Sequence, residues 1–429
     1  MDKLEIIGGV SLDGEISISG SKNAALPILA ASLLSDCSLI LKNVPELADI
    51  ALMIELLNQH GCLTIWDKQL KQLRLQMRSL ESLVAPYEIV RKMRASVLVL
   101  GPLLARYHEA RVSLPGGCAI GTRPVDIHIK GLERLGAQIH IEEGYIHAKA
   151  PGGLKGAEIQ LPFPSVGATE NILMAATLAQ GKTVIKNAAR EPEVVDLANC
   201  LIAMGAQISG HGQNNIYVEG IEAFREAEHR ILPDRIETGT YMMAAGITGG
   251  HLFLKNTDIN LVSAESIVLE EMGIVLTPRE NSIQVKGPKR LKPTNVVTAV
   301  FPGYATDLQA QIMALMCVAD GISTVKETIF ENRLMHVPEL CRMGAQIDVL
   351  GADATVRGIE KLKAAEVMAT DLRASVSLVL AALAAEGKTI LNRVYHLDRG
   401  YENLEGKLQA CGAKIRRIKG GEDGERRVF

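Results

Sequence analysis

The segment Leu132-Glu133-Arg134-Leu135-Gly136-Ala137-Gln138-Ile139 has the pattern of a helix that ends at a glycine and runs directly into a strand. Glycine readily adopts the left-handed conformation that terminates a helix, and apolar residues that alternate after it favour a strand. The same pattern occurs five more times, at residues 56–63, 201–208, 269–275, 340–347 and 408–415. The glycines of successive copies are 68 to 75 residues apart. Chance recurrence of a common junction would not give this regularity, so the sequence predicts six similar structural units.

A second element alternates with these junctions, because apolar helical stretches also end at turns that lead into short strands. The stretches and their strands lie at 25–34 and 38–42, 168–179 and 182–186, 238–247 and 251–255, 309–319 and 322–326, and 374–385 and 388–392, and the remaining copy at 95–105 leads through 112–114 into a glycine-rich loop. Each unit therefore contains two helices and several short strands. A unit of this size cannot cover both faces of its own sheet, so the copies must pack together. A chain of 429 residues exceeds one ordinary core, and we predict two domains of three units each.

The composition indicates a globular protein without a general affinity for nucleic acid or membranes. Hydrophobic residues make up 47% and charged residues 22%, and the net charge of −3 gives no broad attraction to polyanions. No uncharged run reaches the length of a membrane span, and the first residues lack the apolar core of a signal peptide. The seven cysteines form no CxxC pair, which argues against a disulfide framework or a zinc site. We therefore expect a reduced, cytoplasmic protein.

The glycine-rich loop carries a candidate reactive thiol. Cys118 follows Gly116 and Gly117 and lies five residues before Arg123. A thiol near a fixed positive charge has a lowered pKa and acts as a nucleophile or an acid, and a guanidinium binds phosphate or carboxylate. The alternative for an isolated cysteine is a small buried apolar side chain. We expect that alternative for the cysteines in or beside apolar segments, which are Cys37, Cys62, Cys200, Cys317, Cys341 and Cys411.

Charged residues recur where the helices and turns of the units meet. Lys22 and Asn23 open the first apolar helix, and a helix N-terminus with an added cation favours an anion. An exposed arginine is usually only a solvated surface charge, but equivalent positions in stacked units could bring several arginines to one cleft. These arginines are Arg94, Arg123, Arg333, Arg373 and Arg399. Asp307 is the carboxylate of this set, and as an acid at a helix start it could also be a simple N-cap.

Ten segments, in order along the chain, carry recognisable motifs. They are SGSKNAALPILAA at 19–31, MRASVLVLGPL at 93–103, LPGGCAIGTRPVDIHI at 114–129, SVGATENILMAA at 165–176, AAREPEVVDLAN at 188–199, LPDRIETGTYM at 232–242, TDLQAQ at 306–311, ENRLMHVPELCRMGA at 331–345, ATDLRASVSLVLAA at 369–382 and YHLDRGYE at 395–402. Through these motifs the chain resembles the UDP-N-acetylglucosamine 1-carboxyvinyltransferases, the enolpyruvyl transferases that open peptidoglycan synthesis. The resemblance extends from the first residue to about residue 419.

The resemblance implies an α/β fold made of inside-out α/β barrels (α/β prisms). It implies two domains, each with three β-α-β-α-β-β repeats, in agreement with the six junctions. Residues 20–229 should form one domain, residues 1–19 and 230–429 the other, and the active site should lie in the cleft between them. Residues 420–429 lie beyond the resemblance, and we expect them to be a disordered tail.

The activity implied by the resemblance is transfer of enolpyruvate from phosphoenolpyruvate to the 3-hydroxyl of UDP-N-acetylglucosamine, with release of phosphate. It implies addition followed by elimination, without a metal or an organic cofactor. The expected partners are these two small molecules, with no nucleic acid and no membrane, and a monomer is the favoured state.

The same resemblance implies roles for single residues. Cys118 should be the general acid and the site of a phosphoenolpyruvate-derived adduct, and Asp307 the general base. The implied phosphoenolpyruvate contacts are Lys22, Asn23, Arg123 and Arg399, of which Lys22 and Arg399 are also expected to be catalytic. The implied contacts to the UDP-sugar are Asn23, Arg94, Arg123, Pro124, Val125, Asp126, Ile127, Ser165, Val166, Gly167, Asp307 and Ile329, with Arg333 and Arg373 in support. Some members carry a lysine at the position of Phe163. In this chain a ring that is able to stack on the base therefore replaces a charge that could bind phosphate.

Three other functions make different predictions. The sister transferase that acts on shikimate 3-phosphate shares the fold and the chemistry but lacks the Pro-Gly-Gly-Cys loop. A non-catalytic protein that only binds a UDP-sugar should have lost Asp307, Lys22 or the loop thiol, and all three are present. A relative that processes RNA ends should have a basic surface, which the net charge of −3 does not support.

Overall fold

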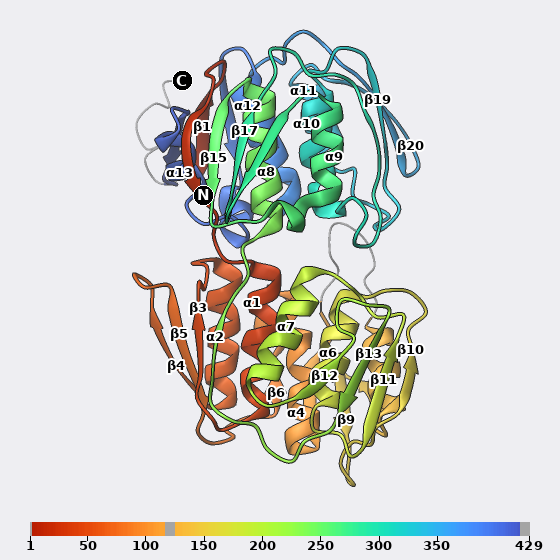
Figure 1. Ribbon diagram of the computed structural model, residues 1–429. Coiled ribbons are helices and arrows are strands. Elements are labelled where there is room, and N and C mark those ends of the chain that lie inside the picture. The colour runs from red at the N-terminus through yellow and green to blue at the C-terminus, as the bar shows by residue number, and fades with distance from the viewer. Residues whose placement is uncertain (1, 116–124, 421–429) are drawn as a thin grey trace. The chain divides into compact units, whose positions relative to one another are not determined.

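The computed structural model describes residues 2–115 and 125–420, which form two compact units. Among these residues, unit 1 comprises 2–19 and 233–420, and unit 2 comprises 20–115 and 125–232. Each unit has its own hydrophobic core, and no side chain of the described residues belongs to both cores. The chain therefore starts in unit 1, passes into unit 2 after Ser19, and returns at Pro233 (Figure 1).

Within the described residues, three four-stranded sheets belong to each unit. The strands of unit 2 are β3 (Leu39–Lys42), β4 (Cys62–Asp67), β5 (Gln72–Met77), β6 (Val84–Ala85), β7 (Glu109–Ser113), β8 (Gln138–Glu142), β9 (Tyr145–Lys149), β10 (Glu158–Gln160), β11 (Lys182–Lys186), β12 (Gln207–Ser209), β13 (Asn215–Glu219) and β14 (Ala227–Arg230). They form sheets in the orders β14-β3-β5-β4, β6-β7-β9-β8 and β10-β11-β13-β12.

The strands of unit 1 are β1 (Lys3–Ile7), β2 (Asp13–Ser17), β15 (His251–Lys255), β16 (Val275–Arg279), β17 (Ser282–Lys286), β18 (Asn295–Val297), β19 (Ile322–Lys326), β20 (Gln346–Leu350), β21 (Asp353–Arg357), β22 (Glu366–Met368), β23 (Lys388–Asn392) and β24 (Lys414–Ile418). Their sheets have the orders β16-β17-β15-β2, β18-β19-β21-β20 and β22-β23-β1-β24.

The helices follow the same division. In unit 2 they are α1 (Lys22–Ala31), η1 (Ser32–Leu34), α2 (Ala48–His60), α3 (Tyr87–Val90), η2 (Arg94–Val99), α4 (Leu100–Tyr107), α5 (Asp126–Arg134), α6 (Val166–Ala176) and α7 (Pro192–Ala203). In unit 1 they are α8 (Arg235–Thr248), η3 (Ile259–Val262), α9 (Ser263–Glu271), η4 (Thr306–Leu308), α10 (Gln309–Met316), α11 (Val337–Arg342), α12 (Leu372–Ala384), η5 (Val394–Arg399) and α13 (Leu404–Ala410). No helix in these described ranges combines the length and the apolar character that a membrane crossing requires.

Each sheet repeats one connection pattern. In the repeat from β10 to β13, β10 lies parallel to β11 across the helix α6, and the hairpin β12–β13 adds two antiparallel strands. Three of the described repeats are completed by strands from distant parts of the chain, because β14 pairs parallel with β3, β2 pairs parallel with β15, and β1 pairs antiparallel with β23 and β24. The predicted six-fold repeat is therefore present, and long-range pairing closes the first repeat of unit 2 and the first and last repeats of unit 1.

The glycine at each predicted junction has the conformation that the pattern requires. The φ angles of Gly61, Gly136, Gly205, Gly273, Gly344 and Gly412 lie between 92° and 113°. Residues with a Cβ rarely adopt this left-handed region, whereas glycine enters it without a steric penalty. These six glycines end their helices and turn the chain into the hairpin strands.

One helix of each repeat is buried on every side. In α10 every residue from Gln309 to Met316 is buried, and α6 and α12 are buried along nearly their whole length. A helix that is apolar all round belongs in a core, and in each unit the sheets lie outside a group of such helices (Figure 1). This arrangement agrees with the predicted inside-out α/β fold class.

One expectation about the cysteines was wrong. Cys341 is exposed on α11, and Cys37 is only partly buried, whereas Cys62, Cys200, Cys317 and Cys411 are buried as expected. Leu340 and Val337 of α11 face the core. Since successive helical residues are rotated by about 100°, the residue after Leu340 points toward solvent.

Candidate active site

In unit 2 the predicted site residues lie at the starts of four helical segments. They are Lys22 and Asn23 on α1, Arg94 on η2, Val125, Asp126 and Ile127 at α5, and Ser165, Val166 and Gly167 at α6. The first N–H groups of a helix have no acceptor within the helix and carry a partial positive charge. These helix starts therefore combine backbone donors with the cations Lys22 and Arg94, a set suited to a negatively charged ligand.

The ammonium of Lys22 is held by a carboxylate that sequence reasoning missed. Its Nζ lies 3.3 Å from Oδ2 of Asp49 on α2, and the two side chains are only 10% and 4% exposed. A buried charge is costly unless it is paired. Asp49 therefore stabilises a cation at the start of α1, and nothing in the sequence marks it, because it lies on the next helix.

A buried histidine and asparagine bring three of the helix starts together. The Nδ2 of Asn171 on α6 donates to the Val97 carbonyl at 3.0 Å and to Nδ1 of His128 at 3.1 Å, while its Oδ1 accepts from the Gly101 N–H at 2.6 Å. Burial, reinforced by the charge of Arg94, lowers the pKa of His128 to about 4, so the ring is neutral near pH 7.

Gly167 of α6 lies close to the His128 ring of α5. A Cβ at Gly167 would lie 3.3 Å from Cε1 of His128, so the absent side chain leaves room for the ring. Both Gly167 and His128 belong to the quoted motifs, and their spacing gave no sign of this contact. The contact places Ser165 and Val166 beside the start of α5.

Three predicted residues, Cys118, Arg123 and Pro124, lie outside the described residues. Their roles as general acid and adduct site, as anion ligand and as UDP-sugar contact stay predictions from the resemblance. Phe163 is described, and its side chain is 56% exposed, so its ring is accessible to a ligand.

In unit 1 the structure places Asp307 between two arginines. Its Oδ1 accepts from Nη2 of Arg333 and its Oδ2 from Nη2 of Arg373, each at 2.7 Å. The side chains of these arginines are 4% and 7% exposed, and that of Asp307 is 26% exposed. The N-cap interpretation of Asp307 is wrong, because Asp307 lies inside η4 and neither η4 nor α10 has a side-chain cap.

The two guanidinium groups decide the charge of Asp307. Burial by itself raises the pKa of this carboxyl, but the charges of Arg373 and Arg333, with their hydrogen bonds, outweigh burial and hold the pKa well below its usual range. The carboxylate is therefore ionised, and each of its oxygens accepts one of these hydrogen bonds. A carboxylate whose pKa is held this low is a weak base while both pairs are intact.

Further residues hold this cluster in place, and sequence reasoning missed their roles. Asp371 caps α12 by accepting from the N–H groups of Arg373 and Ala374 at 2.8 and 3.1 Å. The Tyr401 ring lies 6.0 Å from the Arg373 guanidinium, and Gln311 Nε2 donates to the Asp307 carbonyl at 2.9 Å. Asp371 and Tyr401 belong to the quoted motifs, and only the folded chain reveals that they face the same arginine.

The remaining predicted residues of unit 1 lie on neighbouring segments. Arg399 ends η5, which packs against α12, the helix that carries Arg373. The pKa of His396 is lowered by burial and by the charge of Arg399. Ile329 is partly buried, and its N–H donates to Oε1 of Glu327 at 2.8 Å.

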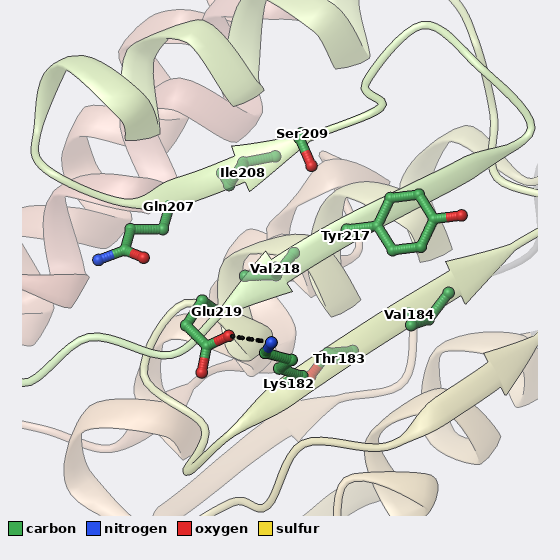
Figure 2. A pocket seen from close by; sticks show the side chains of 9 residues that line it. All are labelled: Lys182, Thr183, Val184, Gln207, Ile208, Ser209, Tyr217, Val218 and Glu219. Carbon is green, nitrogen blue, oxygen red and sulfur yellow. Dashed lines mark ion pairs between the residues drawn. The ribbon is translucent and has the colours of Figure 1, made fainter.

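The shallow pocket in Figure 2 contains none of these residues. Its lining comes from β11, β12 and β13, with Tyr217 exposed and Lys182 3.7 Å from Glu219. Its volume of about 430 Å³ lies on the outer face of a sheet rather than at the helix starts. Within residues 2–115 and 125–420, no cluster of three or more His, Cys, Asp or Glu side chains is arranged to hold a metal ion.

Comparison with known proteins relates nearly the whole chain to carboxyvinyltransferases. Residues 6–408 match the family described as EPSP synthase (3-phosphoshikimate 1-carboxyvinyltransferase). The UDP-N-acetylglucosamine 1-carboxyvinyltransferases of Granulibacter bethesdensis and Dinoroseobacter shibae are each 58% identical over 420 residues, covering 98% of this chain and 100% of theirs. The chain belongs to the UDP-N-acetylglucosamine 1-carboxyvinyltransferase family. The resemblance inferred from the motifs is thereby confirmed.

Solved structures confirm the fold of this family member. The enolpyruvyl transferase NikO from Streptomyces tendae is 24% identical, with a TM-score of 0.89, over 98% of this chain and 99% of that one. An EPSP synthase from Acinetobacter baumannii is 18% identical, with a TM-score of 0.76, over 98% of this chain and 100% of that one. The predicted fold class is therefore confirmed.

Proposed function

We propose that this protein transfers enolpyruvate from phosphoenolpyruvate to the 3-hydroxyl of UDP-N-acetylglucosamine and releases phosphate. The observation that carries the proposal is the 58% identity over 420 residues to transferases named for that reaction. The shikimate 3-phosphate reaction is the weaker candidate, because the EPSP synthase from Acinetobacter baumannii is only 18% identical. Lys22 and Asp307 are both present in folded, charged clusters, which also argues against a protein that only binds the sugar.

The proposed reaction proceeds by addition and elimination. In the addition, C3 of phosphoenolpyruvate gains a proton, the sugar hydroxyl loses one, and its oxygen bonds to C2. In the elimination, C3 loses a proton and the bond from C2 to the phosphate oxygen breaks, which restores the vinyl group. The protein must therefore bind two anions, donate a proton at C3 and accept one from the hydroxyl.

Asp307 is the proposed acceptor of the hydroxyl proton. Its pKa is held low by Arg373 and Arg333, which makes it a weak base while both pairs are intact. A phosphate or carboxylate of an arriving substrate competes for these guanidinium groups. Loss of one pair would raise the pKa of Asp307 and free one of its oxygens for the hydroxyl, so substrate binding itself would activate the base.

The other predicted residues complete the proposal. Lys22, Asn23, Arg123 and Arg399 would bind phosphoenolpyruvate, and Cys118 would donate the proton to C3 and form the adduct. The UDP-sugar would bind at the starts of η2, α5 and α6, through Arg94, Val125–Ile127 and Ser165–Gly167, with Pro124 and Ile329.

This activity would place the protein in the cytoplasm, in the synthesis of the peptidoglycan precursor on which cell-wall growth, cell shape and cell division depend. We also propose that it works as a monomer, without nucleic acid or membrane partners. The net charge of −3 supports the absence of a polyanionic partner.

The test is release of phosphate from phosphoenolpyruvate with either acceptor present. Release that depends on UDP-N-acetylglucosamine supports the proposal. Release that depends on shikimate 3-phosphate instead would show the sister activity, and binding of the UDP-sugar without release would show a protein that has lost catalysis.

A further inference from the structure

Glu327 is a buried carboxylate that no sequence pattern marked as functional. It follows β19 directly and is 4% exposed. Among the described residues it takes part in no ion pair, and it is stabilised by hydrogen bonds alone. A buried carboxylate without a cation is costly, so its donors must be well placed.

Four donors converge on this carboxylate. Oε1 accepts from Thr298 Oγ1 at 3.0 Å, from the Ile329 N–H at 2.8 Å and from the Phe330 N–H at 3.1 Å. Oε2 accepts from Thr306 Oγ1 at 2.9 Å. Glu327 therefore connects the end of β18, the turn after β19 and the first residue of η4.

Two of these segments carry predicted site residues: η4 carries Asp307, and the turn after β19 carries Ile329. Thr306 immediately precedes Asp307 in η4, and the Ala305 N–H on its other side donates to Oε1 of Glu265 at 2.8 Å. Phe330 lies against the guanidinium of Arg333 at 5.2 Å, and Arg333 in turn binds Asp307. The contacts thus form a closed ring through Glu327, Thr306, Asp307, Arg333 and Phe330.

We propose that Glu327 is a positioning residue for catalysis, acting through Thr306 on Asp307 and through the backbone on Ile329. It sets the distance between the proposed base and the proposed UDP-sugar contact, so that the bound sugar presents its hydroxyl to Asp307. This inference rests on the proposed function, because only that function gives Asp307 and Ile329 their roles. A misplacement of a base by a fraction of a bond length is enough to lower the rate of proton transfer.

The test changes Thr306 rather than Glu327, because removing the carboxylate would leave four donors without an acceptor and could prevent folding. Thr306→Val keeps the shape of the side chain but removes the hydroxyl that reaches Glu327, and Thr306→Ser keeps that hydroxyl. The matched control is Thr294→Val. Thr294 Oγ1 donates to Oε2 of Glu271 at 3.1 Å, before the start of β18, which is the same type of bond away from Asp307.

The expected result is a loss of kcat in one variant only. A hydrogen bond to a charged group corresponds to about 10- to 100-fold in rate when it is lost from the transition state. Thr306→Val should lose turnover on this scale while its KM for phosphoenolpyruvate stays unchanged. Thr306→Ser should recover most of the rate, and Thr294→Val should lower the melting temperature without changing kcat.

The outcomes separate this inference from the function on which it rests. Turnover of the wild-type protein with UDP-N-acetylglucosamine tests the proposed function alone, and its absence overturns both. If the wild type turns over and Thr306→Val has the same kcat, Glu327 has no positioning role. A parallel loss of kcat in Thr306→Val and Thr294→Val would equally overturn it, because the effect would then follow stability.

Discussion

Replacing Asp307 by asparagine tests the charged cluster most directly. In the wild type, each carboxylate oxygen accepts from one guanidinium at 2.7 Å. The asparagine oxygen can still accept from one arginine, but the amide nitrogen is a donor and faces the other guanidinium. The variant therefore loses one hydrogen bond, places two donors against each other, and removes the counter-charge that the two buried cations share.

The structure sets the size of the stability loss. Breaking a buried ion pair costs about 3–5 kcal/mol when it leaves a buried charge uncompensated. The arginine side chains are 4% and 7% exposed, but that of Asp307 is 26% exposed, which favours the lower end of this range. We expect a loss of about 3 kcal/mol in the free energy of unfolding of unit 1 at pH 7. For a unit of this size, that corresponds to a melting temperature about 6–12 °C lower.

The stability difference should depend on pH in one direction. The folded-state pKa of Asp307 lies well below its ordinary value of 3.8, so the carboxylate form is favoured by folding. The stabilisation is complete above about pH 4 and is lost as the pH falls through the folded-state pKa. The asparagine variant has no such titration. The difference in unfolding free energy between wild type and variant should therefore shrink as the pH falls below 4.

Calorimetry and a phosphate-release assay on the same samples check both parts of this prediction. Removal of a general base should lower kcat by about 10²- to 10⁴-fold. The matched control is Asp348→Asn, which breaks an exposed pair with Arg357 whose side chains are 72% and 51% exposed, and which should change stability by less than about 1 kcal/mol. A variant Asp307→Asn that melts with the wild type and turns over at its rate would refute the reasoning.

Three further predictions concern the helix-to-strand junctions and the cysteine thiols. Gly344→Ala should lower the free energy of unfolding by about 1–2 kcal/mol, because φ is +92° at this position and no atom lies near the new Cβ, so that only backbone strain contributes. Gly344→Asn should lower it less, because asparagine adopts the left-handed conformation more readily than alanine. Urea denaturation measures both changes. Fosfomycin, an epoxide phosphonate that mimics phosphoenolpyruvate, should alkylate Cys118, more readily with UDP-sugar bound, and a mass spectrum without an adduct on that peptide would contradict the assignment. Among the described cysteines, the exposed Cys341 should react first with a disulfide reagent. Cys317, whose pKa is raised by burial to about 12, should react only on unfolding. Equal reaction rates of the two thiols in the native protein would contradict the structure.

Much of the fold could be predicted because its signals are local. A glycine such as Gly136 ends a helix through its own φ, and the pattern around it needs only a few neighbouring residues. Six such junctions were enough to predict six repeats. The exposure of Cys341 was not predicted, because the choice between the two sides of a short helix depends on what packs against it.

Local patterns also could not tell what Asp307 does. From the sequence it was either an N-cap or a carboxylate among arginines. Its two partners, Arg333 and Arg373, lie 26 and 66 residues further along the chain, Arg333 in the same repeat and Arg373 in the next one. The choice therefore depended on how segments that are separated in the sequence pack together, and the same is true of Lys22 with Asp49 and of Thr306 with Glu327.

The sequence by itself determined the repeat, the helix-to-strand junctions, the family and the identity of the charged residues. The tertiary structure alone decided which strands close the repeats, as β1 and β14 do, and which charges become partners. The physical reason is the range of the interactions. Backbone conformation is set by each residue and its neighbours, whereas strand pairing and buried ion pairs form only after distant segments have packed together.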